Sequence, residues 1–165
     1  MSISQDEKRS FSEQQPHPLF VAVHSEDPEL QEAYANAAAT MPKFLIYVLQ
    51  SGSRTCAAKL RFRDPNESNR VGRDVLLYLW LTDVVYDHSV DRFVGTFFEV
   101  PIELQEWHCR GQELEFEGED VFDWFVNDGG HMHGGFTLRV NRSRLPESER
   151  AAFDRYVGVH EWAET

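Results

Sequence analysis

The chain has 165 residues, of which 41% are hydrophobic, so it can form one domain with a buried core and is not globally disordered. It carries 28 acidic and 16 Lys or Arg residues, which gives a net charge of −12. A surface of this sign repels phosphate backbones and anionic lipid headgroups. These numbers argue against nucleic acid and membrane partners and favour a basic protein partner.

The ends of the chain and its cysteines indicate a cytoplasmic protein. Residues 1–18 are polar and predict a flexible N-terminal extension, followed by a single domain over 19–158 and a tail over 159–165. No apolar segment has the pattern of a signal peptide or the length of a membrane span. Cys56 and Cys109 fit no metal-binding spacing, so we expect free thiols and no cofactor.

The first predicted elements are a short edge strand at 19–23 and a helix over 28–40. Asp27-Pro28-Glu29 is typical of a helix start, because Asp caps free amides and Pro is tolerated in the first turn. Pro42 is expected to end this helix. The apolar run 43–49 then predicts a buried strand.

The middle of the chain predicts a series of strands. Their ranges are 58–63, 75–85, 92–100, 113–116 and 121–126, with a polar loop at 64–74 and a short helical turn at 102–106. Alternation in 136–140 predicts one more strand, and a final helix follows Pro146. The predicted fold class is α+β, a curved antiparallel sheet of about six strands with an N-terminal and a C-terminal helix packed on it.

Four blocks of the sequence carry a resemblance to a known family. They are Asp27-Pro28-Glu29 with 41–44; Ala58–Phe62 with Leu79–Val84; Phe93–Gly95 with Pro101, Gly111-Gln112 and Val121–Trp124; and Gly134–Arg139. In their order and spacing they resemble the bacterial YegJ-like family, domain of unknown function 2314, over roughly residues 26–140. Many relatives have a polar pair where this chain has Leu77–Leu79, and an Asn where it has Val100. The family has no settled activity, so the resemblance implies no catalytic residues.

Two acidic features are candidate partner-binding sites. Glu113, Glu115 and Glu117 alternate along one predicted strand and place three carboxylates on one face, with Asp120 just beyond. Such a ribbon suits a basic protein surface, or it is simply a solvated face. Asp123-Trp124 has two interpretations as well: a carboxylate beside an aromatic platform for a ligand, or a core Trp next to a turn-capping Asp.

The candidate metal ligands are His131 and His133 in the segment Gly-Gly-His-Met-His-Gly-Gly. Alternate residues of an extended segment point to one side, so both imidazoles can face one ion. The alternative is a polar loop with solvated histidines.

Three functional hypotheses follow, of which the least specific is a domain that regulates or supports a larger assembly through a flat apolar patch. The first is a non-enzymatic acidic interaction module, of the kind found in immunity or antitoxin proteins, because no nucleophile elbow or phosphate-binding loop is present. The second is a small enzyme or a metal- or ligand-binding protein with a site around His131, His133 and Asp123. The sequence does not indicate the oligomeric state.

Overall fold

The structure is a computed structural model that describes residues 27–50 and 52–165. The predicted extension at 1–18 and the predicted strand at 19–23 lie outside the described residues. The helices are α2 (Pro28–Ala39), α3 (Met41–Leu49), α4 (Pro65–Val71), α5 (Phe136–Ser143) and α6 (Glu147–Val157), with the 3-10 helices η1 (Ile102–Leu104) and η2 (Gly118–Asp120). The strands are β1 (Thr55–Arg63), β2 (Leu76–Asp87), β3 (Arg92–Phe97), β4 (Glu113–Phe116), β5 (Val121–Asp128), β6 (His131–Gly134) and β7 (Glu161–Trp162).

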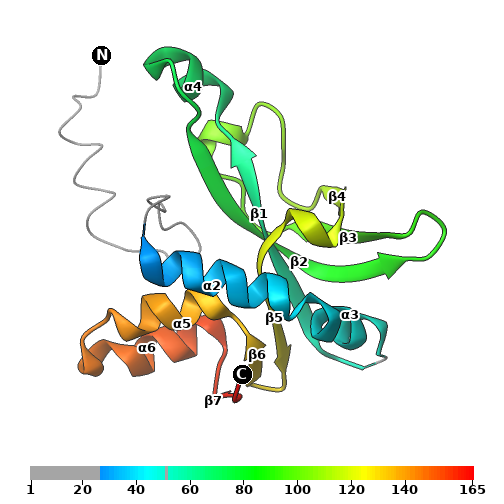
Figure 1. Ribbon diagram of the computed structural model, residues 1–165, viewed down its shortest axis with the longest axis vertical. Helices are drawn as coiled ribbons and strands as arrows, with labels where there is room; N and C mark the ends of the chain where they lie inside the picture. Colours follow the sequence, from blue (N-terminus) through cyan, green and yellow to red (C-terminus); the bar gives the residue numbers. More distant parts are fainter. Residues whose placement is uncertain (1–26, 51) are drawn as a thin grey trace.

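The described strands form one sheet in the order β4-β3-β2-β1-β5-β6-β7 (Figure 1). All neighbours are antiparallel except β6 and β7, which are parallel. The predicted α+β class and the largely antiparallel sheet are therefore confirmed. The last strand, β7, lies in the segment that the sequence assigned to a tail.

The sheet curls on itself between β4 and β5. These strands lie four strand spacings apart in the sheet order, which is roughly 19 Å across a flat sheet. The chain joins them through Glu117 and the three residues of η2, and a 3-10 helix rises only about 2 Å per residue. A flat arrangement would exceed this reach, so β4 bends back toward the start of β5.

The segment after Pro42 forms a helix, so the predicted strand at 43–49 is wrong. Pro42 is in the first turn of α3, where its missing N–H costs no hydrogen bond. The chain bends at Thr40, and the indole N–H of Trp124 donates to the Thr40 hydroxyl at 3.1 Å. The continuous apolar run did not distinguish a strand from a helix that packs at the edge of the core, with Ile46 still exposed.

The segment 131–143 is also different from the prediction. Residues 131–134, expected to be a loop, form β6, and the expected strand at 136–140 is the first part of α5. Gly134 and Gly135 both have positive φ and turn the chain from β6 into α5. The Asp123 side chain caps this helix by accepting from the Phe136 N–H, 13 residues later in the chain. A local sequence pattern does not reveal a cap that lies so far from the helix.

The predicted loop at 64–74 contains α4, a helix of seven residues. Its signals repeat those of α2: the Asp64 side chain accepts from the Glu67 N–H at 2.9 Å, and Pro65 follows the cap. Gly72 ends the helix in the left-handed conformation.

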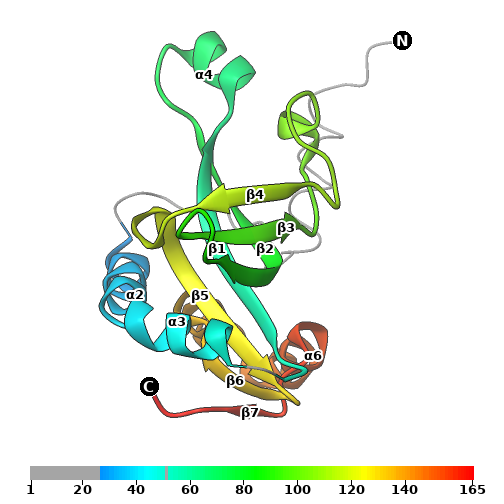
Figure 2. The same ribbon diagram turned by 90° about the vertical axis from the view of Figure 1, so that its right-hand side faces the viewer.

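Two apolar clusters fill the space on either side of the sheet. In Figure 2, α2 and α3 lie on one side of β5 and α6 lies on the other. The cluster beneath α2 and α3 contains Phe44 and Trp124, whose rings are 5.3 Å apart. The smaller cluster beneath α5 and α6 contains Trp80, Leu138 and Phe153. β5 is thus buried on both faces, whereas β4 is at a free edge.

We expect Gly134→Ala to destabilise the protein more than Gly129→Ala. Both glycines have positive φ, +69° and +60°, so both substitutions carry the backbone cost of about 1–2 kcal/mol. A Cβ at Gly134 would lie 2.4 Å from the Trp124 carbonyl oxygen, whereas one at Gly129 has nothing within 4 Å. Urea unfolding should show a further loss of about 1–3 kcal/mol for Gly134→Ala. Equal losses would contradict this packing.

Candidate functional site

The acidic edge consists of Glu113, Glu115, Glu119 and Asp120, on β4 and η2. Along β4, Glu113 and Glu115 are exposed, whereas Leu114 is half-buried and Phe116 is buried. The predicted alternation of these two carboxylates is present. Glu117 lies beyond the strand, where it pairs with Arg92 at 3.0 Å. Asp120 is exposed and accepts the Glu117 backbone N–H at 2.9 Å.

A hollow of about 290 Å³, the β1–β4 groove, lies beside the acidic edge. It exists because the sheet curls and brings β4 near β1 and the start of β5. Its lining consists of Leu60, Arg61, Phe62, Leu114, Glu115, Phe116, Glu119, Asp120 and Phe122. Aromatic and aliphatic side chains therefore meet three of the four acidic-edge carboxylates in one concavity. This combination suits a cationic side chain, which gains from both carboxylates and aromatic ring faces.

Asp123 and Trp124 are both buried and lie outside this surface. The Asp123 carboxylate accepts from the backbone N–H of Phe136 at 3.1 Å and of Thr137 at 2.8 Å. It therefore caps the start of α5 from β5. The Trp124 side chain packs against Phe44 in the core. Of the two interpretations of this pair, the geometry favours the packed and capping one, and neither side chain is accessible to a partner of the folded protein.

Lys59 is the buried counter-charge of Asp123, and the sequence analysis did not identify it. It lies opposite Asp123 in the β1–β5 ladder and is only 5% exposed. Its ammonium donates to the Thr137 hydroxyl at 2.8 Å, and that hydroxyl lies 2.5 Å from the Asp123 carboxylate. Burial lowers the pKa of Lys59 to about 8, although Asp123 opposes the shift. Lys59 alternates with Ala58 and Leu60 in the predicted strand, a pattern typical of an exposed strand face, so the sequence carries no local signal of its burial.

The two predicted metal ligands each lie beside a different side chain. The His131 ring lies 3.3 Å from the Glu161 carboxylate, and the His133 ring lies 3.2 Å from the Tyr47 hydroxyl of α3. Burial lowers the pKa of His133, which favours its neutral form. Asp123 instead faces the start of α5. In residues 27–50 and 52–165, no group of three or more His, Cys, Asp or Glu side chains has a geometry that could hold a metal ion.

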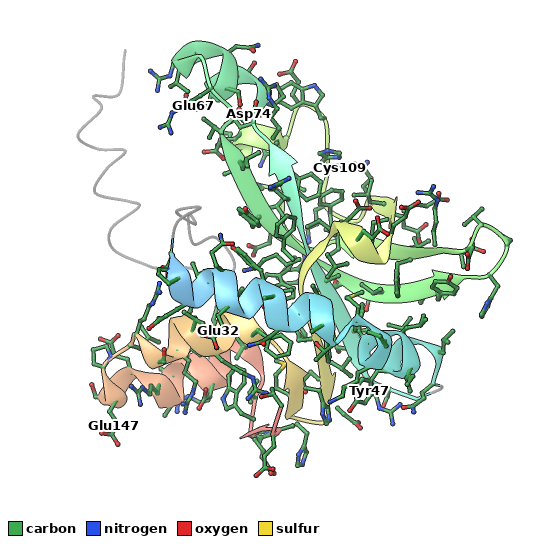
Figure 3. All side chains as sticks on the ribbon, viewed as in Figure 1. Glu32, Tyr47, Glu67, Asp74, Cys109 and Glu147 are labelled. Atoms are coloured by element: carbon green, nitrogen blue, oxygen red, sulfur yellow. The ribbon has the colours of Figure 1, made fainter. Side chains whose placement is uncertain are left out.

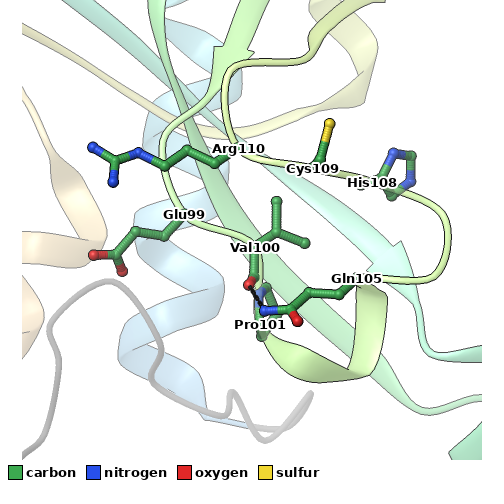
Figure 4. Close-up of a pocket in the computed structure, with 7 residues that line it drawn as sticks. All are labelled: Glu99, Val100, Pro101, Gln105, His108, Cys109 and Arg110. Atoms are coloured by element: carbon green, nitrogen blue, oxygen red, sulfur yellow. Dashed lines mark hydrogen bonds between the residues drawn. The ribbon is translucent and has the colours of Figure 1, made fainter.

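The two cysteines lie in different surroundings. Cys56 is buried in the core, where desolvation raises the pKa of its thiol. Cys109 is exposed in the segment that joins β3 to β4 (Figure 3). It lines a second hollow, which Figure 4 shows between Glu99 and His108. In that hollow Gln105 donates to the Val100 carbonyl, so its amide is already engaged.

A family model described as an uncharacterised protein conserved in bacteria, DUF2314, matches residues 27–160. The chain belongs to this family. The uncharacterised protein YegJ of Escherichia coli K12 is 26% identical over 120 residues, which cover 73% of this chain and 71% of that protein. A putative ankyrin repeat protein of Neisseria meningitidis serogroup B is 26% identical over 86 residues, covering 52% of this chain and 33% of that protein. No solved structure matches the chain.

The DUF2314 match extends about one helix beyond the resemblance seen in the sequence, because it includes α6. It begins at the residue that caps α2 and ends between α6 and β7. It therefore contains the acidic edge, the β1–β4 groove and the Lys59–Asp123 pair. No helix in the described part of this DUF2314 protein is long and apolar enough to cross a membrane.

Removal of the buried carboxylate by Asp123→Asn should destabilise the protein by about 3–5 kcal/mol, because Lys59 would keep a buried charge without its partner. Thr137→Val, which removes only the bridging hydroxyl, should cost about 1–3 kcal/mol. Chemical denaturation measures both. Glu119→Gln is the matched control at an exposed carboxylate and should stay within about 0.5 kcal/mol of wild type. If Asp123→Asn behaved like the control, the pair would not stabilise the fold.

The lowered pKa of Lys59 predicts a pH dependence of stability. In the unfolded chain the amine titrates near 10.5, and in the folded protein near 8. Between these values the unfolded chain binds a proton that the folded protein has released, so stability rises with pH. The free energy of unfolding of wild type relative to Lys59→Met should rise by about 3 kcal/mol between pH 7 and pH 11.

Subtracting the free energy of unfolding of Lys59→Met removes the contribution of titrating groups that both proteins share. Tyr34 is one such group, because burial raises its pKa. A difference that stays constant across this range would show that Lys59 keeps its ordinary pKa. A fall with pH would show that the folded protein stabilises the charged amine.

Proposed function

We propose that this DUF2314 protein is a non-enzymatic interaction module that binds a basic protein partner through the acidic edge. The observation that carries the proposal is the position of Glu115, Glu119 and Asp120 around the aromatic lining of the β1–β4 groove. Complementary charge brings a basic partner to this surface and fixes its orientation. An immunity or antitoxin-like protein that masks a basic partner is one concrete form of this function.

The glutamates of the acidic edge carry charge that is not neutralised within the described part of the molecule. Many carboxylates are engaged internally; Asp27 and Glu29, for example, both bind Arg144. Within residues 27–50 and 52–165, no ion pair engages Glu113, Glu115 or Glu119. These three side chains are exposed, so their charge is available to a partner. Three unpaired like charges on one short segment also repel each other, and a cationic partner relieves that repulsion.

The test is an affinity capture with the tagged full chain at low salt, read by mass spectrometry. Simultaneous substitution of Glu113, Glu115 and Glu119 by Lys should abolish capture of a stoichiometric basic partner. The control substitutes Lys for Glu32, Glu106 and Glu164, which are exposed on other parts of the molecule. It changes net charge by the same amount and should keep the partner. Salt of about 0.5 M should release the partner from wild type, because it shortens the range of charge attraction to a few Å.

Equal loss of the partner in both triple variants would mean that only net charge matters. Retention of the partner by the Glu113, Glu115 and Glu119 variant would place the binding surface elsewhere. Either result would overturn the proposed role of the acidic edge.

A further inference from the structure

β4 presents unpaired backbone groups as well as carboxylates. Phe97 donates to the Gln112 carbonyl and accepts from the Gly111 N–H, both at 2.9 Å. Hydrogen-bonded pairs alternate along an antiparallel ladder, so the next bonded pairs are Gly95–Leu114 and Phe93–Phe116. The N–H and C=O groups of the two intervening glutamates therefore point away from β3. No described strand pairs with β4 on that side.

The side chains of β4 alternate in the same register. Glu113 and Glu115 are exposed, and Leu114 and Phe116 are half-buried or buried. A strand added beside β4 would place successive side chains opposite these two kinds of residue. Its residues on one face would meet carboxylates. Those on the other face would meet apolar side chains that line the β1–β4 groove.

We propose that β4 binds an extended segment of the basic partner as an additional strand, and that this segment alternates Lys or Arg with apolar residues. The inference rests on the proposed function and specifies how the acidic edge recognises its partner. Main-chain hydrogen bonds to residues 113 and 115 supply affinity, and the alternating side chains supply specificity. The groove receives the apolar side chains next to Phe62 and Phe122.

The charge of the edge selects this occupant over a second copy of the same chain. Two β4 strands paired with each other would bring glutamates directly opposite glutamates, and like charges in such pairs are destabilising. Charged residues on a free edge oppose self-association for this reason. A strand that carries Lys or Arg at those positions replaces the repulsion with attraction.

Arg61 occupies part of the groove and opposes the binding of a basic strand. Its guanidinium carbon lies 4.9 Å from the centre of the Phe122 ring, within the range of a cation–π contact. Arg61 belongs to β1 and lines the same groove as Glu115 and Glu119. An apolar side chain of the partner would compete with Arg61 for the Phe122 ring, and the charge of Arg61 would repel the partner's Lys or Arg residues. Replacement of Arg61 should therefore strengthen the binding of a basic strand.

The test measures the affinity of the full chain for three peptides at low salt. The first alternates Lys and Val, and the second has the same composition in separate Lys and Val blocks. The third is the alternating peptide N-methylated on the Lys amides, which are the ones that would face β4. We expect the alternating peptide to bind at least about tenfold more tightly than the other two, because only it can pair with β4 and fill the groove. Arg61→Gln should increase that affinity several-fold, and Glu113→Lys with Glu115→Lys should abolish it.

NMR identifies the paired backbone directly. The amide signals of residues 113 and 115 should shift and become protected from hydrogen exchange on addition of the alternating peptide. Equal affinity for all three peptides, lost in the charge-reversed variant, would overturn strand addition while the acidic edge kept its proposed function. Binding that survives the charge reversal would overturn both proposals, and so would the absence of binding by any of the peptides. Self-association of the chain through β4 would also overturn the selection of a basic occupant.

Discussion

The buried Asp123 carboxylate is the interaction on which the arrangement of the layers depends. It caps α5, receives the Thr137 hydroxyl and lies opposite Lys59 of β1. A buried charge is tolerated only when donors surround it and an opposite charge lies near. Burial raises the pKa of this carboxyl, and Lys59 with the hydrogen bonds from Thr137 opposes that rise. The position of α5 relative to the sheet follows from satisfying these donors together.

The neighbouring residue extends the constraint to the other layer. Trp124 donates its indole N–H to the Ala37 carbonyl at 3.3 Å and to the Thr40 hydroxyl, at the junction of α2 and α3. Its ring also packs edge-on against Phe136, at the start of α5. Two consecutive residues of β5 therefore hold three helices against the sheet. Asp123 and Trp124, which in the sequence could have been a ligand site, are therefore at the centre of the packing. The helices that they hold do not cover β4, so the groove beside β4 stays open.

The sequence predicted the elements whose signals are local. Helix α2 has its cap and first-turn Pro in consecutive positions, and β1 to β5 have short β-rich patterns. The segments of α3 and α5 were both predicted as strands, and the two errors have a common cause. Each helix begins where a distant side chain from β5 binds the backbone or the turn. Those partners are 84 and 13 residues away in sequence. The missed helix α4 is a different case, because its cap, Pro65 and Gly72 are all local and were sufficient to predict it.

The candidate site likewise combines a feature with a local sequence signal and a feature that depends on distant parts of the chain. The alternation of Glu113 and Glu115 was predictable from the period of a strand, but the groove was not, because it depends on the curl that η2 imposes. Acidity that served solubility alone would need only to be distributed over the surface. Here six arginine side chains pair with carboxylates in the described chain. Unpaired glutamates also occur on other surfaces, but Glu113, Glu115 and Glu119 lie beside unpaired backbone groups of β4 and a hollow lined by aromatic rings. Free charge, free backbone groups and a concave apolar lining therefore coincide on the four residues of β4, and this coincidence is the basis of the proposal that the edge recognises a partner.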